Sequence, residues 1–195
     1  DEHGNKKRNI GSPYGTTVAD YDQMKNLLVE LRETPDSRRH IIDLWQLEEF
    51  KKPHGLNPCA YSTVWNVRHG RDGVDYLDMK LIQRSSDFLV AGCINQMQYV
   101  ALMLMVSQAT GYVPGKFTWD VQNIQIYDRH IKQAVELLNR EPVNCIEDDY
   151  TEPYLSLNPG ISDFYDFTMD DIHIKNYPRE LIKTKNPQLK FDKGI

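Results

Sequence analysis

The segment from Cys59 to Arg68 constrains the fold more than any other part of this sequence, because its side chains alternate in character at every second position. A period of two is typical of a strand that buries one face. The residues expected on the buried side are Cys59, Tyr61, Thr63, Trp65 and Val67. A turn-like segment, 69–73, and a second strand-like segment, 74–83, follow. We therefore expect a β-hairpin.

Helical patterns lie on both sides of this hairpin. Residues 1–19 are rich in glycine and proline and are expected to form a loop. A helix is expected to begin at Asp20, with Gln23 completing a capping box, and to end before Pro35. Gln96–Thr110 is apolar nearly all round, which indicates a buried helix, and Gly111 is suited to cap its end.

The remaining segments complete a mixed pattern of strands and helices. An amphipathic helix is expected from Asp128, and shorter strands are expected at residues 40–45, 116–127, 154–157 and 171–177. The length of 195 residues suits one domain with its own core. We therefore predict an α+β fold with a substantial sheet, in a single domain covering residues 1–195.

The composition argues against several classes of protein. The net charge is −5 with the two signs mixed, whereas a protein that binds a nucleic-acid polymer usually has a basic stripe. The longest unbroken apolar run, Val100 to Val106, is far shorter than the ~20 residues of a membrane span, and no secretory leader is seen. The three cysteines form no C-x-x-C pair. We expect a cytoplasmic protein without membrane, metal or disulfide framework.

Cys59 is a candidate nucleophile, because it follows Asn57-Pro58 at the start of the expected strand. A small buried core thiol is the alternative for an isolated cysteine. A reactive thiolate needs positive or hydrogen-bonding neighbours. Two arginine clusters, Arg38-Arg39 and 83–87, contain such groups. Arginines, a serine and a cysteine together suit one phosphate beside one electrophilic ring.

These residues also carry a family resemblance. Their order and spacing resemble those of the thymidylate synthase family, within the superfamily that also contains the pyrimidine hydroxymethylases. The similar segments, spread over roughly positions 10–177, are Ile10–Gly15, Pro35–Arg39 with Trp45, Pro58-Cys59, Gln83-Arg84-Ser85 with Asp87, Asn95, Tyr99, Gln108, Gly111, Ile126-Tyr127, His130, Leu157–Pro159, Asp166–Thr168, Asp170-Asp171 and Asn176-Tyr177. The resemblance implies a large twisted mixed sheet flanked by helices, with a buried central helix.

The resemblance implies a covalent reaction on a pyrimidine nucleotide. The thiolate of Cys59 would add to carbon 6 of deoxyuridylate, and carbon 5 would then take a one-carbon unit from 5,10-methylenetetrahydrofolate, with no metal. Tyr14 matches a residue implicated in removing the proton from carbon 5. Asp87 matches a residue near the folate and the base, and Trp45 is expected on the folate side.

The resemblance also assigns the phosphate contacts. Arg84 and Ser85 match the ligands that come from the same subunit, with Gln83 beside them at the nucleotide. Arg38 and Arg39 match a pair that reaches the site of the other subunit. An obligate homodimer with shared sites is therefore implied.

The resemblance assigns base and ribose contacts at three further positions, two of which match the family. Asn95 matches the residue that reads the base, and its carboxamide can pair with both the carbonyl and the N–H of uracil. Its alternative role is a helix N-cap. Tyr127 matches a ribose contact, with a core tyrosine as the alternative, and Gln125 stands where the family usually has a histidine.

Several positions depart from the family pattern. Ala60 replaces the histidine that usually follows the cysteine, and Val64 replaces a common glutamine. Residues 91–94 replace the usual glycine-x-proline-phenylalanine, Gln46 replaces an asparagine, and the tail after Tyr177 is longer than expected. The family's opening segment, with another phosphate arginine and a glutamate, has no counterpart in this sequence.

Three hypotheses for the function follow. The first is methylation of deoxyuridylate to thymidylate. The second is hydroxymethylation, in which water replaces the hydride; Trp119 and Ala60 resemble the hydroxymethylases in this respect. The third is a nucleotide-binding homologue without turnover, suggested by the altered positions.

Overall fold

The computed structural model describes residues 14–48, 57–142 and 151–192. The chain forms two compact units. The first consists of residues 1–85 and 110–123, and the second of residues 86–109 and 124–195. The prediction of a single domain over the whole chain stays a prediction.

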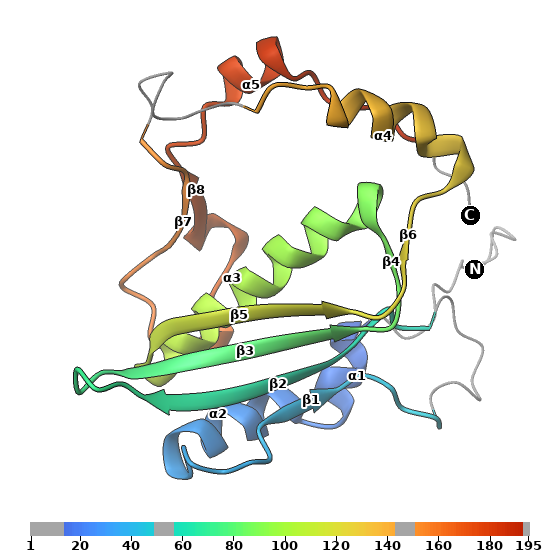
Figure 1. Cartoon of the computed structure of the whole chain (residues 1–195). Helices are drawn as coiled ribbons and strands as arrows, with labels where there is room; N and C mark the ends of the chain where they lie inside the picture. Colours follow the sequence, from blue (N-terminus) through green and yellow to red (C-terminus); the bar gives the residue numbers. More distant parts are fainter. Residues whose placement is uncertain (1–13, 49–56, 143–150, 193–195) are drawn as a thin grey trace, which may run out of the picture. The chain divides into compact units, whose positions relative to one another are not determined.

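The first unit is built on a four-stranded mixed sheet with the order β1-β2-β3-β5. The strands are β1 (Ile41–Asp43), β2 (Ala60–His69), β3 (Asp75–Gln83) and β5 (Val113–Val121). β2 runs antiparallel to β1 and to β3, whereas β5 lies parallel to β3. The predicted β2–β3 hairpin is confirmed (Figure 1).

The alternation along β2 is confirmed over most of its length. Three residues of the predicted apolar side are buried: Thr63, Trp65 and Val67. At the start of the strand the predicted phase is wrong, because Ala60 is buried whereas Cys59 and Tyr61 are only half-buried. The pairing with β3 shifts register between Ala60 and Ser62, and such an irregularity changes which side a residue faces.

Helices α1 (Tyr14–Asp20) and α2 (Gln23–Glu33) lie against one face of this sheet (Figure 1). The buried stripe of α2 is the one that the sequence predicts: Met24, Leu27, Leu28 and Leu31. α2 ends before Pro35, as predicted. The loop predicted for residues 1–19 is wrong at 14–19, because these residues are helical, and its part before residue 14 lies outside the described residues.

The predicted capping box at the start of α2 is also wrong. Asp20 ends α1, and the residue before α2, Asp22, has a positive φ of 51° and no capping side chain. The side chain of Gln23 instead binds the edge strand β1. Its Nε2 donates to Asp43 O over 2.8 Å, and its Oε1 accepts from Asp43 N over 2.7 Å. Gln23 therefore fastens α2 to the sheet.

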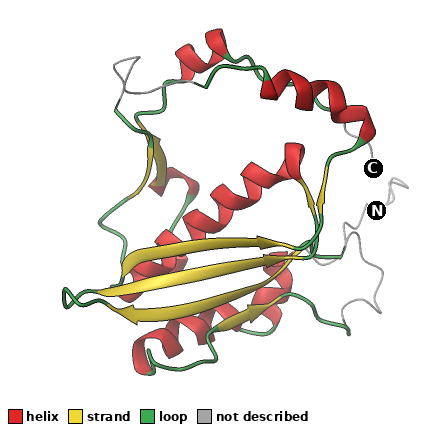
Figure 2. Ribbon diagram, in the orientation of Figure 1, coloured by secondary structure: helices red, strands yellow, loops and turns green. Residues whose placement is uncertain are grey.

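The second unit contains mostly helices and two short sheets (Figure 2). β4 (Ser86–Asp87) pairs in parallel with β6 (Ile124–Gln125), and β7 (Tyr154–Leu157) pairs antiparallel with β8 (Ile172–Lys175). The helices are α3 (Cys93–Thr110), α4 (Ile131–Leu138) and α5 (Arg179–Lys185). Shorter turns are η2 (Phe88–Gly92), η3 (Asp128–His130), η4 (Phe164–Asp166) and η5 (Met169–Asp171).

Helix α3 confirms the predicted apolar helix, and Gly111 follows it with a φ of 83°. Its burial is one-sided. The buried residues are Tyr99, Met103, Val106, Ser107 and Ala109, whereas Ile94 and Met97 are 63% and 53% exposed. The 23-residue segment Phe88–Thr110 is long and apolar enough to cross a membrane, a criterion that the core helix of a soluble protein also meets.

Candidate active site

Cys59 lies at the bend that leads into β2, directly after the buried Pro58. The β2–β3 pairing places Ala60 opposite Gln83, so the residues just outside the two strands also meet. Arg84 N donates to Cys59 O over 2.9 Å. The hairpin therefore brings together two residues that are 25 positions apart in the sequence.

The Arg84 side chain turns back over the cysteine. Its Nε donates to Pro58 O and its Nη2 to Asn57 O, each over 3.1 Å. The same Nη2 lies 3.9 Å from Cys59 Sγ, within range of a hydrogen bond to sulfur. A guanidinium held by two carbonyls at fixed positions keeps its positive charge beside the thiol. The two backbone carbonyls are part of the site that the sequence analysis did not identify.

Trp45 also lies near this guanidinium. The Arg84 Cζ is 5.7 Å from the centroid of the Trp45 ring, which is within cation–π range. Trp45 also meets Tyr61 edge to face, with ring centroids 6.1 Å apart. Of the residues predicted for the site, the structure thus brings together Cys59, Arg84 and Trp45.

Gln83 is fully buried at the end of β3. Its Oε1 accepts a hydrogen bond from Trp119 Nε1, and its backbone oxygen accepts from Gln122 N over 3.0 Å. The other side-chain atom, Nε2, is a buried donor without a partner among the residues that the structure describes. A buried donor without a partner costs free energy, so this N–H is expected to bind a ligand or a water molecule.

The remaining predicted residues of the first unit lie nearer to solvent. Ser85 is half-buried after β3, whereas Arg38 and Arg39 are exposed in the segment between α2 and β1. Arg39 N donates to Ser37 Oγ over 3.3 Å. Tyr14 is the first residue of α1; its side chain, like residues 10–13 before it, lies outside the described part of the chain.

In the second unit, Asp87 and Gln125 are neighbours. They pair directly across the β4–β6 ladder, with Gln125 exposed. Asp87 is half-buried, and its Oδ1 is a buried acceptor without a hydrogen-bond partner in the described ranges. An unpaired carboxylate oxygen is suited to accept from an N–H of a ligand.

Asn95 and Tyr127 also belong to the second unit. Asn95 is the third residue of α3 and half-buried, so its alternative role as the N-cap is wrong. Tyr127 is 45% exposed, so the alternative of a core tyrosine is wrong as well. The Arg129 Cζ lies 4.3 Å from the centroid of the Tyr127 ring, and His130 meets the ring edge to face at 5.9 Å.

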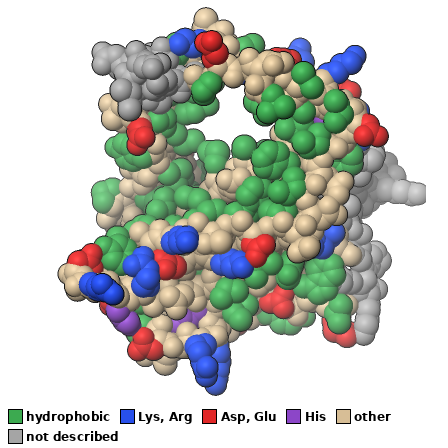
Figure 3. Space-filling view, in the orientation of Figure 1, with side chains coloured by type: hydrophobic (Ala, Val, Ile, Leu, Met, Phe, Trp, Pro, Cys, Tyr) green, Lys and Arg blue, Asp and Glu red, His purple; other side chains and the backbone are tan. Residues whose placement is uncertain are grey.

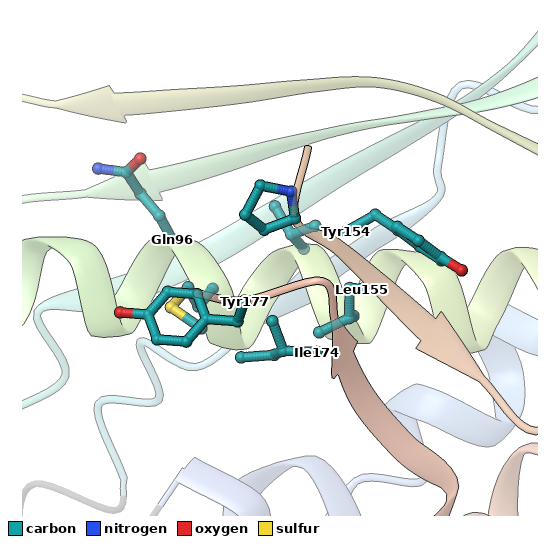
Figure 4. Close-up of a pocket in the computed structure, with 8 residues that line it drawn as sticks. Gln96, Tyr154, Leu155, Ile174 and Tyr177 are labelled. Atoms are coloured by element: carbon teal, nitrogen blue, oxygen red, sulfur yellow. The ribbon is translucent and has the colours of Figure 1, made fainter. Parts of the chain in front are cut away.

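A pocket of the second unit lies between α3 and the β7–β8 hairpin (Figure 4). It is lined mostly by apolar side chains: Gln96, Met97, Val100, Pro153, Tyr154, Leu155, Ile174 and Tyr177. None of the predicted catalytic or nucleotide-binding residues lines it. Within the described residues no cluster of three or more His, Cys, Asp or Glu side chains could hold a metal ion.

Comparison with known proteins decides the family. The family model described as thymidylate synthase matches residues 1–187. This chain belongs to the thymidylate synthase family. It is 45% identical over 187 residues to the thymidylate synthase of Streptococcus mutans serotype c, covering 95% of this chain and 63% of that protein. It is 43% identical over 190 residues to the enzyme of Streptococcus thermophilus, covering 97% of this chain and 62% of the relative.

A solved structure confirms the predicted fold class. Thermostable thymidylate synthase A from Bacillus subtilis superimposes with a TM-score of 0.76 at 32% identity, covering 90% of this chain and 62% of that one. The thymidylate synthase fold, with its mixed sheet, flanking helices and central helix, is therefore shown. The chain spans 62–63% of the length of these relatives.

Proposed function

We propose that this protein methylates carbon 5 of deoxyuridylate to give thymidylate. One observation carries the proposal: the Arg84 guanidinium lies 3.9 Å from Cys59 Sγ and is fixed there by the carbonyls of Asn57 and Pro58. A cationic group beside a cysteine stabilises the thiolate, which is the nucleophilic form. Membership of the thymidylate synthase family supports the reaction.

In this proposal Cys59 forms a bond from sulfur to carbon 6 of the ring. The electron pair of the 5,6 double bond then shifts toward carbon 5 and the neighbouring carbonyl, which makes carbon 5 a nucleophile. Carbon 5 would then bond to the methylene carbon of the folate and lose its proton as the folate nitrogen leaves, and Tyr14 is the candidate to assist the proton's departure. Hydride transfer from the folate to that carbon, with departure of the sulfur from carbon 6, would give the methyl group, restore the 5,6 double bond and release dihydrofolate. Arg84 and Ser85 would hold the nucleotide phosphate on the same subunit.

5,10-Methylenetetrahydrofolate would supply both the one-carbon unit and the hydride. The unpaired, buried Oδ1 of Asp87 is suited to accept from a ring N–H of a pterin. Trp45, half-buried beside Arg84, offers an aromatic surface on which the folate could stack. No residue set is proposed for a metal.

Nucleotide selection and assembly extend the proposal. Asn95 would read the uracil edge, Gln125 and Tyr127 would contact the ribose, and Gln83 would contribute its unpaired Nε2. Arg38 and Arg39, both exposed, would reach the phosphate in the partner's site, so the protein would act as a homodimer. We place this soluble family member in the cytoplasm.

Two measurements test the reaction. Incubation with 5-fluorodeoxyuridylate and methylenetetrahydrofolate should give a covalent adduct on Cys59, detected by mass, and Cys59→Ser should abolish it. Turnover of deoxyuridylate should release dihydrofolate, followed by its absorbance. Product without dihydrofolate would instead establish hydroxymethylation, and absence of any adduct would establish a homologue without turnover.

A further inference from the structure

His69, at the end of β2, lies between two carboxylates from different parts of the first unit. Its Nδ1 is 2.7 Å from Asp75 Oδ1, and its Nε2 is 2.9 Å from Asp36 Oδ1. Asp75 begins β3 and is the cross-strand partner of His69. Asp36 lies 33 residues earlier, in the segment between α2 and β1. The histidine thus joins the hairpin to a remote segment.

That remote segment carries Arg38 and Arg39. It is held at its start by backbone bonds to the end of α2, with Thr34 N donating to Glu30 O over 2.8 Å. It rejoins the sheet at His40, whose oxygen accepts from Trp65 N over 2.9 Å. Between these two anchors, the Asp36–His69 contact ties the segment to the hairpin only two residues before the first arginine.

The contact requires a charged imidazole. A carboxylate oxygen can only accept, so both ring nitrogens of His69 must donate, and a neutral imidazole has only one N–H. With one proton removed, one of the two nitrogens would face a carboxylate with its lone pair. The hydrogen bonds to Asp36 and then to Asp75 accordingly raise the pKa of His69 above its usual value.

The charged groups that act on the His69 ring are carboxylates. Among the charges acting on its ring, the structure describes only Asp36 and Asp75, from the segment before β1 and from β3. Tyr112, ahead of β5, also faces these carboxylates; burial, followed by the two negative charges, raises its pKa, and its hydroxyl donates to Leu31 O over 2.6 Å. Acidic, basic and histidine side chains gather over the β2–β3 turn (Figure 3).

We propose that His69 is a positioning residue: in its protonated form it fastens the segment that carries Arg38 and Arg39 to the β2–β3 hairpin, and it releases that segment when it loses its proton. The functional consequence rests on the proposed role of these arginines in binding the phosphate of the partner's nucleotide. A fastened segment presents its guanidinium groups with less conformational entropy to lose on binding.

The sign of the pH effect follows from the direction of the shift. A group with a raised pKa in the folded state stabilises its contact fully below its unfolded value, about 6.5 for histidine, and loses that contribution as the pH rises through the raised value. His69, Asp36 and Asp75 have side chains that are 54%, 83% and 48% exposed. Exposed ion pairs of this kind change equilibria by about two- to five-fold.

The fastening can be measured without any turnover. Amide hydrogen exchange should show higher protection of residues 36–39 at about pH 6 than at about pH 8.5, after correction for intrinsic rates. Asp36→Asn and His69→Gln should each remove this pH dependence. Asp72→Asn is the matched control, because Asp72 binds Tyr76 Oη over 2.7 Å in the same hairpin and does not touch His69. Equal protection at both pH values, or an equal loss in Asp72→Asn, would overturn the proposal.

The consequence for the reaction is a change in KM rather than in kcat. At about pH 6, Asp36→Asn and His69→Gln should raise the KM for deoxyuridylate about two- to five-fold, and the difference from the unchanged protein should vanish at about pH 8.5. A KM difference that does not depend on pH would reduce His69 to a structural role. If the protein without substitutions forms no thymidylate, the proposed function is refuted. The hydrogen-exchange experiment would still show whether His69 holds the segment that carries Arg38 and Arg39.

Discussion

The guanidinium of Arg84 lies 3.9 Å from the sulfur of Cys59 and donates to the carbonyls of Asn57 and Pro58, the two residues before this cysteine. The arginine therefore has two tasks in the proposed site. It fixes the loop that enters β2, and it keeps a positive charge beside the nucleophile. A single charge without the planar fork could perform only one of these tasks.

Arg84→Lys is accordingly expected to lower kcat/KM for deoxyuridylate about 10- to 100-fold, the effect of losing one or two hydrogen bonds of a charged group. The rate of adduct formation with 5-fluorodeoxyuridylate should fall with it. Arg71→Lys, at an exposed position of the turn between β2 and β3, is the matched control and should change neither quantity. Unchanged adduct formation in Arg84→Lys would exclude a role of the guanidinium in activating the thiol.

Asn95 offers a test of substrate choice. Uracil and cytosine present opposite donors and acceptors on the edge that Asn95 would read, and a carboxylate or carboxylic acid suits cytosine better than a carboxamide does. Asn95→Asp should weaken use of deoxyuridylate about 100-fold in kcat/KM and should improve binding of deoxycytidylate. Gln98→Asp, which adds the same charge at an exposed position of α3, should affect neither nucleotide. An equal loss for both nucleotides in Asn95→Asp would argue against base reading.

The local patterns in the sequence predicted the local structure well. The period of two between residues 59 and 68 predicted β2, and the helical spacing of Met24, Leu27, Leu28 and Leu31 predicted the buried face of α2. These patterns reflect which side of a single helix or strand faces the core. The spacing of apolar residues within that element is enough to show this side. The parallel pairing of β3 with β5 was not predicted, because the two strands are separated by the whole of α3.

The candidate site was predicted only in part, for a related reason. The resemblance named Cys59, Arg84 and Trp45, and the structure places them together. The carbonyls of Asn57 and Pro58, which hold the guanidinium, could not be predicted, because every residue has a backbone carbonyl and only the fold decides which one is used. The same holds for Gln23, whose predicted cap is replaced by a contact with Asp43, 20 residues away.

Gln23 gives a test of the fold alone. Its amide makes two hydrogen bonds to the backbone of Asp43 and so pairs an N–H and a C=O of the edge strand β1. No further strand covers this edge within the described residues. Gln23→Ala should lower the free energy of unfolding by about 1–3 kcal/mol, measured by urea denaturation. Gln98→Ala, at an exposed helical position, should leave it nearly unchanged. Equal unfolding midpoints for the two variants would show that this contact does not stabilise the sheet.

Asp78 gives a test that depends on pH. Its carboxylate accepts from Arg68 Nε over 2.9 Å and from Lys116 N over 2.7 Å, where the β3–β5 register shifts between Leu77 and Met79. Burial alone would raise the pKa of Asp78, but the bonds from Arg68 and Lys116 outweigh it, and the pKa lies below its usual value. Gly115 leaves the room for this carboxylate, since a Cβ there would overlap Asp78 Oδ1.

A carboxylate whose pKa is lowered by folding stabilises the protein at pH values above its pKa in the unfolded state, about 3.9 for aspartate. This contribution is lost as the pH falls through the pKa of the folded state. Asp78→Asn should therefore lower the free energy of unfolding by about 1 kcal/mol at neutral pH, and the difference should shrink below about pH 4. Asp170→Asn, at an exposed position of η5 in the second unit, is the control for loss of a carboxylate. A difference between Asp78→Asn and the unchanged protein that stays constant from neutral to acidic pH would mean that the carboxylate's charge has no part in joining β3 to β5.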